Sequence, residues 1–144
     1  MVNKMEINNT DEKKERALLI SVDTTRFNAD ISLKELEELA KTAGAEVVGT
    51  SVQKRPTPEV ATYVGTGFLY DITRFCEHSE IDLIIADDEL TPIQIRNLED
   101  ETNTRVIDRT TLILDIFAAR ALSNEGKIQV ELAQLKYRLT RLSG

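Results

Sequence analysis

Carboxylates follow two apolar runs of the chain that are typical of buried strands. Asp23 comes directly after the run at 17–22, and Asp87, Asp88 and Glu89 come after a second run. In parallel α/β sheets ligands bind beyond the carboxyl ends of the strands, where two sets of acids could hold Mg²⁺. Acids that stand before a helix are, however, stabilised by its N-terminus alone. No lysine or threonine partner is evident, so we prefer this electrostatic reading and predict no metal site.

Two glycines open a predicted helix after a long loop. The loop at 53–65 contains two prolines and no periodic pattern, and its length favours a functional or mobile segment. Backbone N–H groups at a helix N-terminus can receive an anion, although a lone G-x-G is a weak signal and a plain turn is the preferred reading. The candidate ligand residues of this loop are Lys54, Arg55, Tyr63, Gly65 and Gly67.

The residue types argue against several common enzyme sites. The stretch nearest to a G-x-x-x-x-G-K-[ST] phosphate loop runs from Gly44 to Ser51, but it lacks the lysine and leads from a helix end into a strand. Cys76 and His78 are the single cysteine and histidine, which excludes a Cys/His zinc site and a His-based triad. We therefore expect no catalytic residue and no cofactor in this chain. A lone cysteine also agrees with a reducing compartment.

Basic residues are concentrated in residues 109–144, here called the arm. The arm contains six basic and three acidic residues, a net charge of +3, whereas the whole chain carries −7. Residues 1–108 therefore carry −10, and a polyanion would meet the arm first. Cations can contact RNA phosphates and tyrosine can stack on a base, although from charge alone a solvated helix face is preferred. The candidate RNA-binding residues are Lys127, Lys136, Tyr137, Arg138 and Arg141.

Strand-like runs alternate with helical patterns before the arm. Apolar runs predict four strands, near 17–22, 45–52, 82–86 and 105–107. Helical spacing of apolar residues predicts a helix between successive strands. This alternation is typical of an α/β fold with a small, mainly parallel sheet flanked by helices, and its crossovers should be right-handed.

Helix ends are predicted from capping residues. Gly44 is suited to end the first helix in the left-handed conformation, and the second helix should cover about residues 67–78. The predicted N-caps are Ser32 with Glu35, Thr91 with Gln94, Asp108, and Asn124.

The last helix carries an apolar stripe whose members are alternately four and three residues apart. Such a heptad seam is typical of a helix that packs lengthwise on another helix. Nothing after Gly144 could supply that partner, so the sequence reads as half of an antiparallel helical hairpin, although two seams could also pair in a homodimer. The seam consists of Ile128, Leu132, Leu135, Leu139 and Leu142. The apolar segment 112–119 should lie between the sheet and this helix.

Composition divides the chain into three parts. Residues 1–15 predict a flexible tail, 16–108 an α/β subdomain, and 109–144 the start of a truncated helical-hairpin subdomain. No apolar run approaches the roughly 20 residues that cross a membrane, and the N-terminus lacks the apolar core of a signal peptide. We therefore expect no membrane span and a cytoplasmic location.

The segment 106–142, VIDRTTLILDIFAARALSNEGKIQVELAQLKYRLTRL, closely resembles the HflX family of translational GTPases. The resemblance extends back through 33–67 and 84–99 and leaves out only the tail. It implies that the chain is the N-terminal region of such a protein, an α/β subdomain followed by a helical hairpin, cut before the GTPase domain.

The same resemblance implies a function. Members of the family bind the large ribosomal subunit, with the hairpin tip directed toward the peptidyl transferase centre, and help to split or rescue ribosomes. Their GTP and Mg²⁺ would be bound by the GTPase domain beyond Gly144, a partner of this region. ATP is also linked to the N-terminal region of some members. The alternative function is therefore an ATP-binding regulatory domain that uses the 53–67 loop and the carboxyl ends of the strands.

The glycine pair departs from the family pattern. Relatives usually carry lysines where this chain has Thr66 and Phe68, so Lys54 and Arg55 are the nearest basic residues. By contrast, residues 125–135 follow the pattern. Three polar residues of that segment are interpreted as orienting the hairpin rather than taking part in chemistry: Gln129, Glu131 and Gln134.

Overall fold

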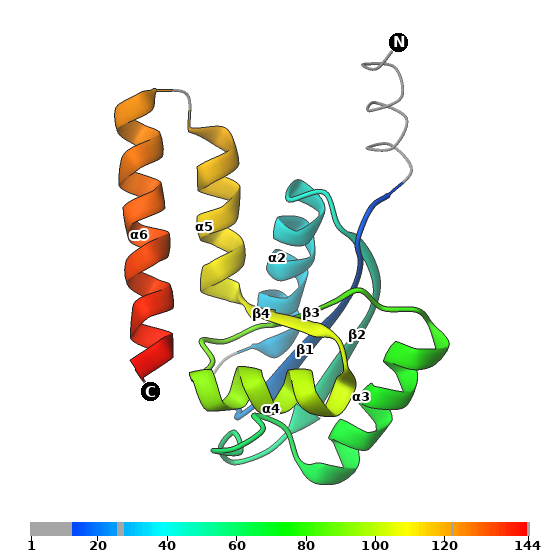
Figure 1. The fold of residues 1–144 in the computed structure, drawn as a ribbon. Helices are drawn as coiled ribbons and strands as arrows, with labels where there is room; N and C mark the ends of the chain where they lie inside the picture. The colour runs from blue at the N-terminus through cyan, green and yellow to red at the C-terminus, as the bar shows by residue number, and fades with distance from the viewer. Residues whose placement is uncertain (1–12, 26–27, 122, 144) are drawn as a thin grey trace.

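Four parallel strands form one sheet in the computed structural model, which describes residues 13–25, 28–121 and 123–143 (Figure 1). The strands are β1 (Arg16–Asp23), β2 (Glu46–Lys54), β3 (Leu83–Ala86) and β4 (Arg105–Asp108), in the spatial order β2-β1-β3-β4. β1 is central because it pairs with both β2 and β3. The predicted α/β fold with a parallel sheet is therefore confirmed.

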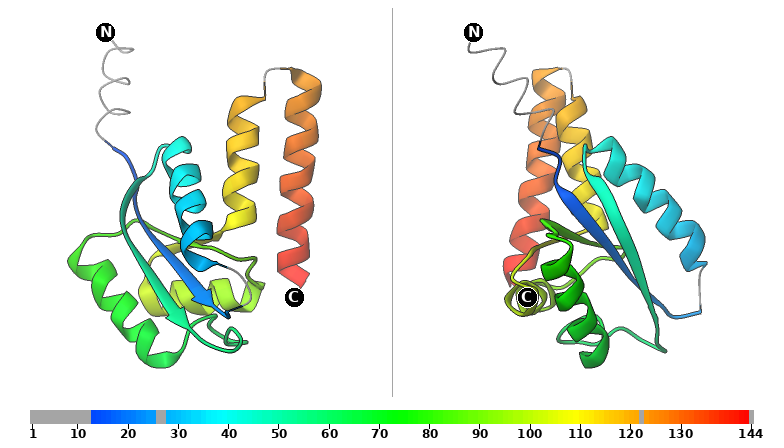
Figure 2. Two further views of the ribbon diagram at one scale, coloured as in Figure 1. Left: turned by 180° about the vertical axis from the view of Figure 1, so that it is seen from behind. Right: turned by 90° about the vertical axis from the view of Figure 1, so that its right-hand side faces the viewer.

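Helices cover both faces of this sheet. α2 and α5 lie on one face and α3 and α4 on the other, while α6 stands beside α5 and away from the sheet (Figures 1 and 2). The bounds are α2 (Ala29–Thr42), α3 (Thr66–His78), α4 (Pro92–Thr102), α5 (Arg109–Arg120) and α6 (Asn124–Ser143).

β1 is buried on both faces, as its continuous apolar run predicts. Leu18 and Ile20 pack with α3 and α4, while Ala17 and Leu19 pack with α2 and α5. From their carboxyl ends, β1 and β3 lead to helices on opposite faces of the sheet. That is the position where open α/β sheets bind ligands, and it is where the predicted acids lie.

Most predicted helix ends are confirmed. Thr91 and Gln94 form a reciprocal capping box at the start of α4. Asp108 accepts the Thr111 N–H and so caps α5. Gly44 follows α2 with a φ of +93°, the left-handed conformation that glycine adopts without strain.

Two predicted helix starts are wrong. α2 begins before Ser32, because the Oδ1 of Asn28 accepts two N–H groups of the first turn and Ser32 lies inside the helix. At the start of α6, the Oγ of Ser123 accepts the Gly126 N–H. Ser123 therefore caps α6, and Asn124 is already its first residue.

The arm is an antiparallel pair of helices, α5 and α6 (Figures 1 and 2). α5 lies between the sheet and α6, as predicted. Its Leu112 and Ile116 join the core, but Phe117 is 55% exposed. The segment 112–119 is therefore buried along one side only.

The apolar seam of α6 faces away from α5. Ile128 is 63% exposed, Leu132 and Leu135 are each 48% exposed and Leu139 is 53% exposed, while the side chain of Leu142 lies outside the described residues. The inward side of α6 includes Gln134, which donates to Asp115 of α5, and Tyr137 and Arg141, which contact the α/β subdomain. Among the seam residues whose side chains the structure describes, none is buried by the pairing of α5 with α6.

The predicted tail at 1–15 falls mostly outside the described residues. Its last residue, Glu15, is attached to the sheet, since its carbonyl accepts the Glu46 N–H and its carboxylate pairs with Arg105 at 3.0 Å. In the part of the chain that the structure describes, no helix is both long enough and apolar enough to cross a membrane.

Candidate functional site

Arg109 pairs with Asp87, the first of the three acids at the end of β3. Its guanidinium lies 2.7 Å from the buried carboxylate of Asp87 and 3.0 Å from Glu35, and it also donates to Ser32. Burial opposes the charge of Arg109, but the hydrogen bond and the charge of Asp87 outweigh it and raise the pKa of the guanidinium. Among the described residues, no group of three or more His, Cys, Asp or Glu could hold a metal. The ion-pair partner of Asp87 within the described part of the chain is Arg109.

Tyr63 ties the 53–65 loop to the same edge of the sheet. It is 1% exposed, and its hydroxyl accepts the Val22 N–H at 3.0 Å and donates to Asp88. Burial raises the pKa of the Tyr63 phenol, and burial also raises the pKa of the Asp88 carboxyl. Because both groups already have partners, this predicted ligand residue holds the loop in place.

The rest of the predicted ligand loop is also held by internal contacts. β2 extends to Lys54, so the loop covers 55–65 rather than 53–65. Arg55 pairs with Glu59 at 3.0 Å, and the Gly65 N–H donates to Gln53. A Cβ at Gly65 would lie 2.8 Å from the Arg55 guanidinium, so a larger residue here would displace the end of the Arg55 side chain.

The loop is also joined to α4. The Gln94 side chain donates to the Glu59 carbonyl at 2.7 Å, and Asn97 donates to the Ala61 carbonyl. Only Lys54 and Gly67 of the five predicted ligand residues are exposed. The structure therefore brings Tyr63, Arg55 and Gly65 into one anchored loop and leaves Lys54 and Gly67 at its surface.

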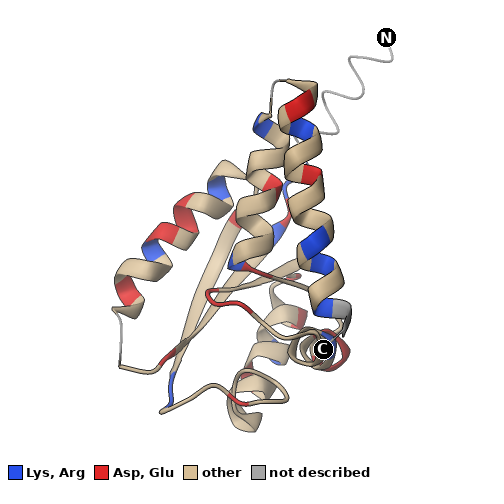
Figure 3. Ribbon diagram, turned by 90° about the vertical axis from the view of Figure 1, so that its left-hand side faces the viewer, with Lys and Arg blue, Asp and Glu red and all other residues tan. Residues whose placement is uncertain are grey.

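The basic residues of the arm fall into two groups. Lys127, Lys136 and Arg138 are exposed on α6, and basic segments mark this helix in Figure 3. Tyr137 and Arg141 are half-buried, and the Arg141 guanidinium lies 4.2 Å from the centre of the Tyr137 ring. The sequence suggested one RNA-binding set, but only the first three side chains project into solvent.

Tyr137 and Arg141 contact the α/β subdomain. The Tyr137 hydroxyl donates to the carboxylate of Asp108, and Arg141 pairs with Glu89 at 3.7 Å. One turn away, Gln134 donates to Asp115 of α5 at 2.9 Å. These contacts fix the side of α6 that faces the body of the molecule.

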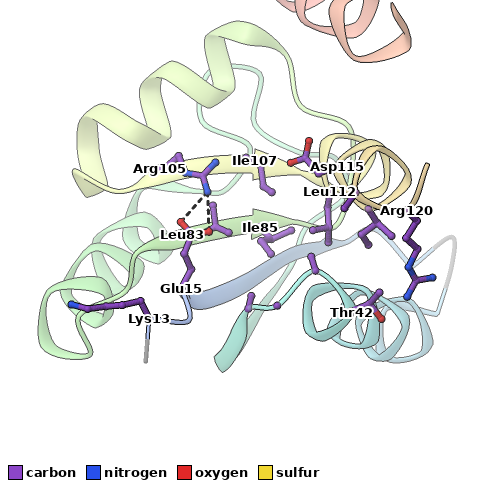
Figure 4. A pocket seen from close by; sticks show the side chains of 15 residues that line it. Lys13, Glu15, Thr42, Leu83, Ile85, Arg105, Ile107, Leu112, Asp115 and Arg120 are labelled. Atoms are coloured by element: carbon purple, nitrogen blue, oxygen red, sulfur yellow. Dashed lines mark hydrogen bonds and ion pairs between the residues drawn. The ribbon is translucent and has the colours of Figure 1, made fainter. Parts of the chain in front are cut away.

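A cavity that sequence reasoning did not find lies at the opposite, amino end of the sheet. It measures about 360 Å³ and has an apolar floor that includes Ile85 and Leu112 (Figure 4). Arg105 and Glu15 close one side and Arg120 stands at the other. Its lining comes from several separate segments, so no single motif could have indicated it.

Two family models match the chain, and the boundary between their matched regions lies near the end of α5. The model described as GTP-binding GTPase N-terminal matches residues 30–118, and that described as GTP-binding GTPase Middle Region matches residues 120–144. The fold and the matched regions define the N-terminal part of a GTP-binding GTPase.

Curated relatives give the family. The chain is 53% identical over 131 residues to the GTPase HflX of Caldanaerobacter subterraneus subsp. tengcongensis and 41% identical over 128 residues to the GTPase HflX of Escherichia coli (strain K12). These alignments cover 91% and 89% of this chain and 30% of each relative. The chain belongs to the HflX family of GTPases and corresponds to its N-terminal region.

Solved structures share the fold. The crystal structure of SsGBP in complex with GDP matches with a TM-score of 0.68 and 30% identity, over 90% of this chain and 36% of that chain. A GTP-binding protein from Sulfolobus solfataricus in complex with GDP matches with a TM-score of 0.66 and 30% identity, over 90% of this chain and 38% of that chain.

Proposed function

We propose that this chain is a ribosome-binding module, in which exposed cations of α6 contact RNA phosphates of the large ribosomal subunit. Within a longer HflX-type protein, the module would bring the GTPase to ribosomes in the cytoplasm and help to split or rescue them. The observation that carries the proposal is the exposure of Lys127, Lys136 and Arg138 on one helix. Among the described residues, none of these three cations has an ion-pair partner.

The charge distribution supports the same proposal. The arm carries +3 and the remainder of the chain −10, so a polyanion is attracted to the arm and repelled by the body. Lys136 directly follows the seam residue Leu135, and Arg138 directly precedes the seam residue Leu139. Because each residue turns an α-helix by about 100°, these two cations lie on opposite sides of the seam. A phosphate backbone lying along α6 would thus meet cations on both flanks.

The alternative of ATP binding at the 53–67 loop has less support. The Gly65 N–H and the Tyr63 hydroxyl are already used within the chain. Of the basic residues near the loop, Arg55 is paired with Glu59 and only Lys54 is exposed without such a pair in the described residues. We therefore retain ribosome binding as the function that the geometry supports best.

Reversing two charges tests this function. We expect Lys136→Glu with Arg138→Glu to weaken co-sedimentation with purified large ribosomal subunits, and to lower the slope of log affinity against log salt by about 1.5–2, since two phosphate contacts are lost. The matched control is Lys34→Glu with Lys41→Glu, which changes the net charge equally on α2. Circular dichroism and urea unfolding should find both double variants folded. Equal affinity of the two double variants, or no binding by the wild type at low salt, would refute the proposal.

A further inference from the structure

Asp108 joins three segments of the molecule through one carboxylate. It is fully buried at the end of β4. Its Oδ1 accepts the Thr111 N–H of α5, and its Oδ2 accepts the Leu90 N–H that precedes α4 and the hydroxyl of Tyr137 on α6. Two of these donors are backbone groups close to the sheet. Tyr137 is the only one of the three that belongs to α6.

Polar side chains attach α6 to the rest of the molecule. Neither core cluster contains a residue of α6 among the residues that the structure describes. The polar side-chain contacts that hold the described part of the helix include Gln134 with Asp115, Tyr137 with Asp108, and Arg141 with Glu89. Hydrogen bonds have directional preferences that apolar contacts lack. A helix attached in this way has its orientation set by a few specific groups.

We propose that Tyr137 is a positioning residue, whose hydroxyl on the buried Asp108 carboxylate fixes the orientation of α6 relative to the α/β subdomain. This inference rests on the proposed function where it concerns the ribosome, since α6 carries the exposed cations. It reassigns Tyr137 from stacking on a base to holding the helix that presents Lys136 and Arg138.

The surroundings of Tyr137 favour this arrangement. Burial and the hydrogen bond to Asp108 raise the pKa of Tyr137 to about 12, so the phenol keeps its proton and remains a donor at physiological pH. The Arg141 guanidinium covers the ring and pairs with Glu89 on the subdomain. The ring is thus held on one side by a cation and at its tip by an anion.

Removal of the Tyr137 hydroxyl tests whether it orients α6 or supports the fold as a whole. In Tyr137→Phe the ring is retained, and Asp108 keeps its bonds to Leu90 and Thr111, so the α5 cap and the β3–α4 connection should survive. A released α6 would fray, because a helix of this length without packing is marginal in water. We expect amide hydrogen exchange of α6 to accelerate about tenfold or more, the effect of losing a hydrogen bond to a charged acceptor.

The matched control is Tyr70→Phe. Tyr70 is an exposed tyrosine of α3 whose hydroxyl accepts a hydrogen bond from Arg74. The control variant therefore loses the same hydroxyl oxygen at a position outside the arm. Its exchange rates should equal those of the wild type throughout. Unchanged exchange of α6 in Tyr137→Phe would overturn the proposal. Acceleration of the β1 and β3 amides by the same factor as α6 would also overturn it, because the hydroxyl would then support the whole fold.

Affinity for large ribosomal subunits tests the functional part separately. If Tyr137 positions the cations, Tyr137→Phe should bind several-fold more weakly than Tyr70→Phe, because a smaller fraction of the molecules holds α6 in the binding orientation. Faster α6 exchange with unchanged affinity would reject the link to the ribosome and retain the structural role. Absence of binding by the wild type would reject the proposed function alone, since the exchange experiment uses no ribosomes.

Discussion

Arg109 illustrates how a single side chain connects parts of the chain that are distant in sequence. It follows β4, yet it pairs with Asp87 at the end of β3 and with Glu35 on α2. The Asp87 side chain has no exposed surface, so its charge would be costly without a counterion. The sequence offered Asp87 only as a metal ligand or as an acid before a helix, because its pairing with Arg109 depends on the fold.

Truncation of Arg109 should leave a buried charge without its partner. We expect Arg109→Ala to lower the free energy of unfolding by about 3 kcal/mol in urea titrations at pH 7, near the lower limit for breaking a buried pair because the guanidinium is partly exposed. The control is Arg105→Ala, whose pair with Glu15 is exposed and should contribute less than about 1 kcal/mol. Similar losses in the two variants would contradict this account of Asp87.

The individual elements divide into those that follow from local sequence and those that follow from packing. The strand order along the chain, the capping box at Thr91 and the cap at Asp108 were predictable because each depends on neighbouring residues. The start of α2 was not predictable from the Ser32 box alone. Asn28 supplies the cap, and Ser32 is instead a partner of Arg109, a contact formed only in the folded chain.

The candidate site was predictable to a smaller extent. The sequence identified the basic character of α6 but not which of its sides would face the body. Tyr137 and Arg141 have the same residue types as a nucleic-acid contact, and only the positions of Asp108 and Glu89 show that they turn inward. The cavity near Ile85 is built from segments far apart in sequence, so periodicity carried no signal for it.

The two candidate caps of α2 can be ranked by experiment. Asn28→Ala should lower the free energy of unfolding by about 1 kcal/mol, because two N–H groups of the first turn lose their acceptor. Ser32→Ala should cost less, since Ser32 caps nothing and its contact with Arg109 is 3.2 Å long. Urea titrations of both variants under one condition measure the order. The reverse order would restore Ser32 as the cap.

At the scale of the whole molecule, the arm presents a polar side to the body and an apolar side to solvent. The seam thus stays accessible while α6 remains attached through Tyr137. An antiparallel pair that stacks Leu132 on Leu135 of a second copy also brings Glu131 of each copy near Arg138 of the other. This charge complementarity favours a second copy as the occupant of the seam in the 144-residue chain.

Light scattering tests such self-association. The wild-type chain should approach twice its monomer mass as concentration rises, whereas Leu135→Lys should remain a monomer because it places a charge in the seam. Val60→Lys, which adds the same charge at an apolar residue 83% exposed outside the arm, should behave as the wild type. A wild type that stays monomeric at every concentration, or a Leu135→Lys dimer, would exclude this pairing.

The strand order also has a consequence for synthesis of the chain. β1 is made first, but β3, which pairs with one of its two edges, follows only after β2 and α3 are complete. At roughly 5–20 residues per second, that edge of an apolar strand has no partner from this chain for about 2–6 seconds after β2 has been made. Unpaired strand edges attract other strands. During synthesis, therefore, one edge of the central strand is open to pairing with strands of other chains until β3 has been made.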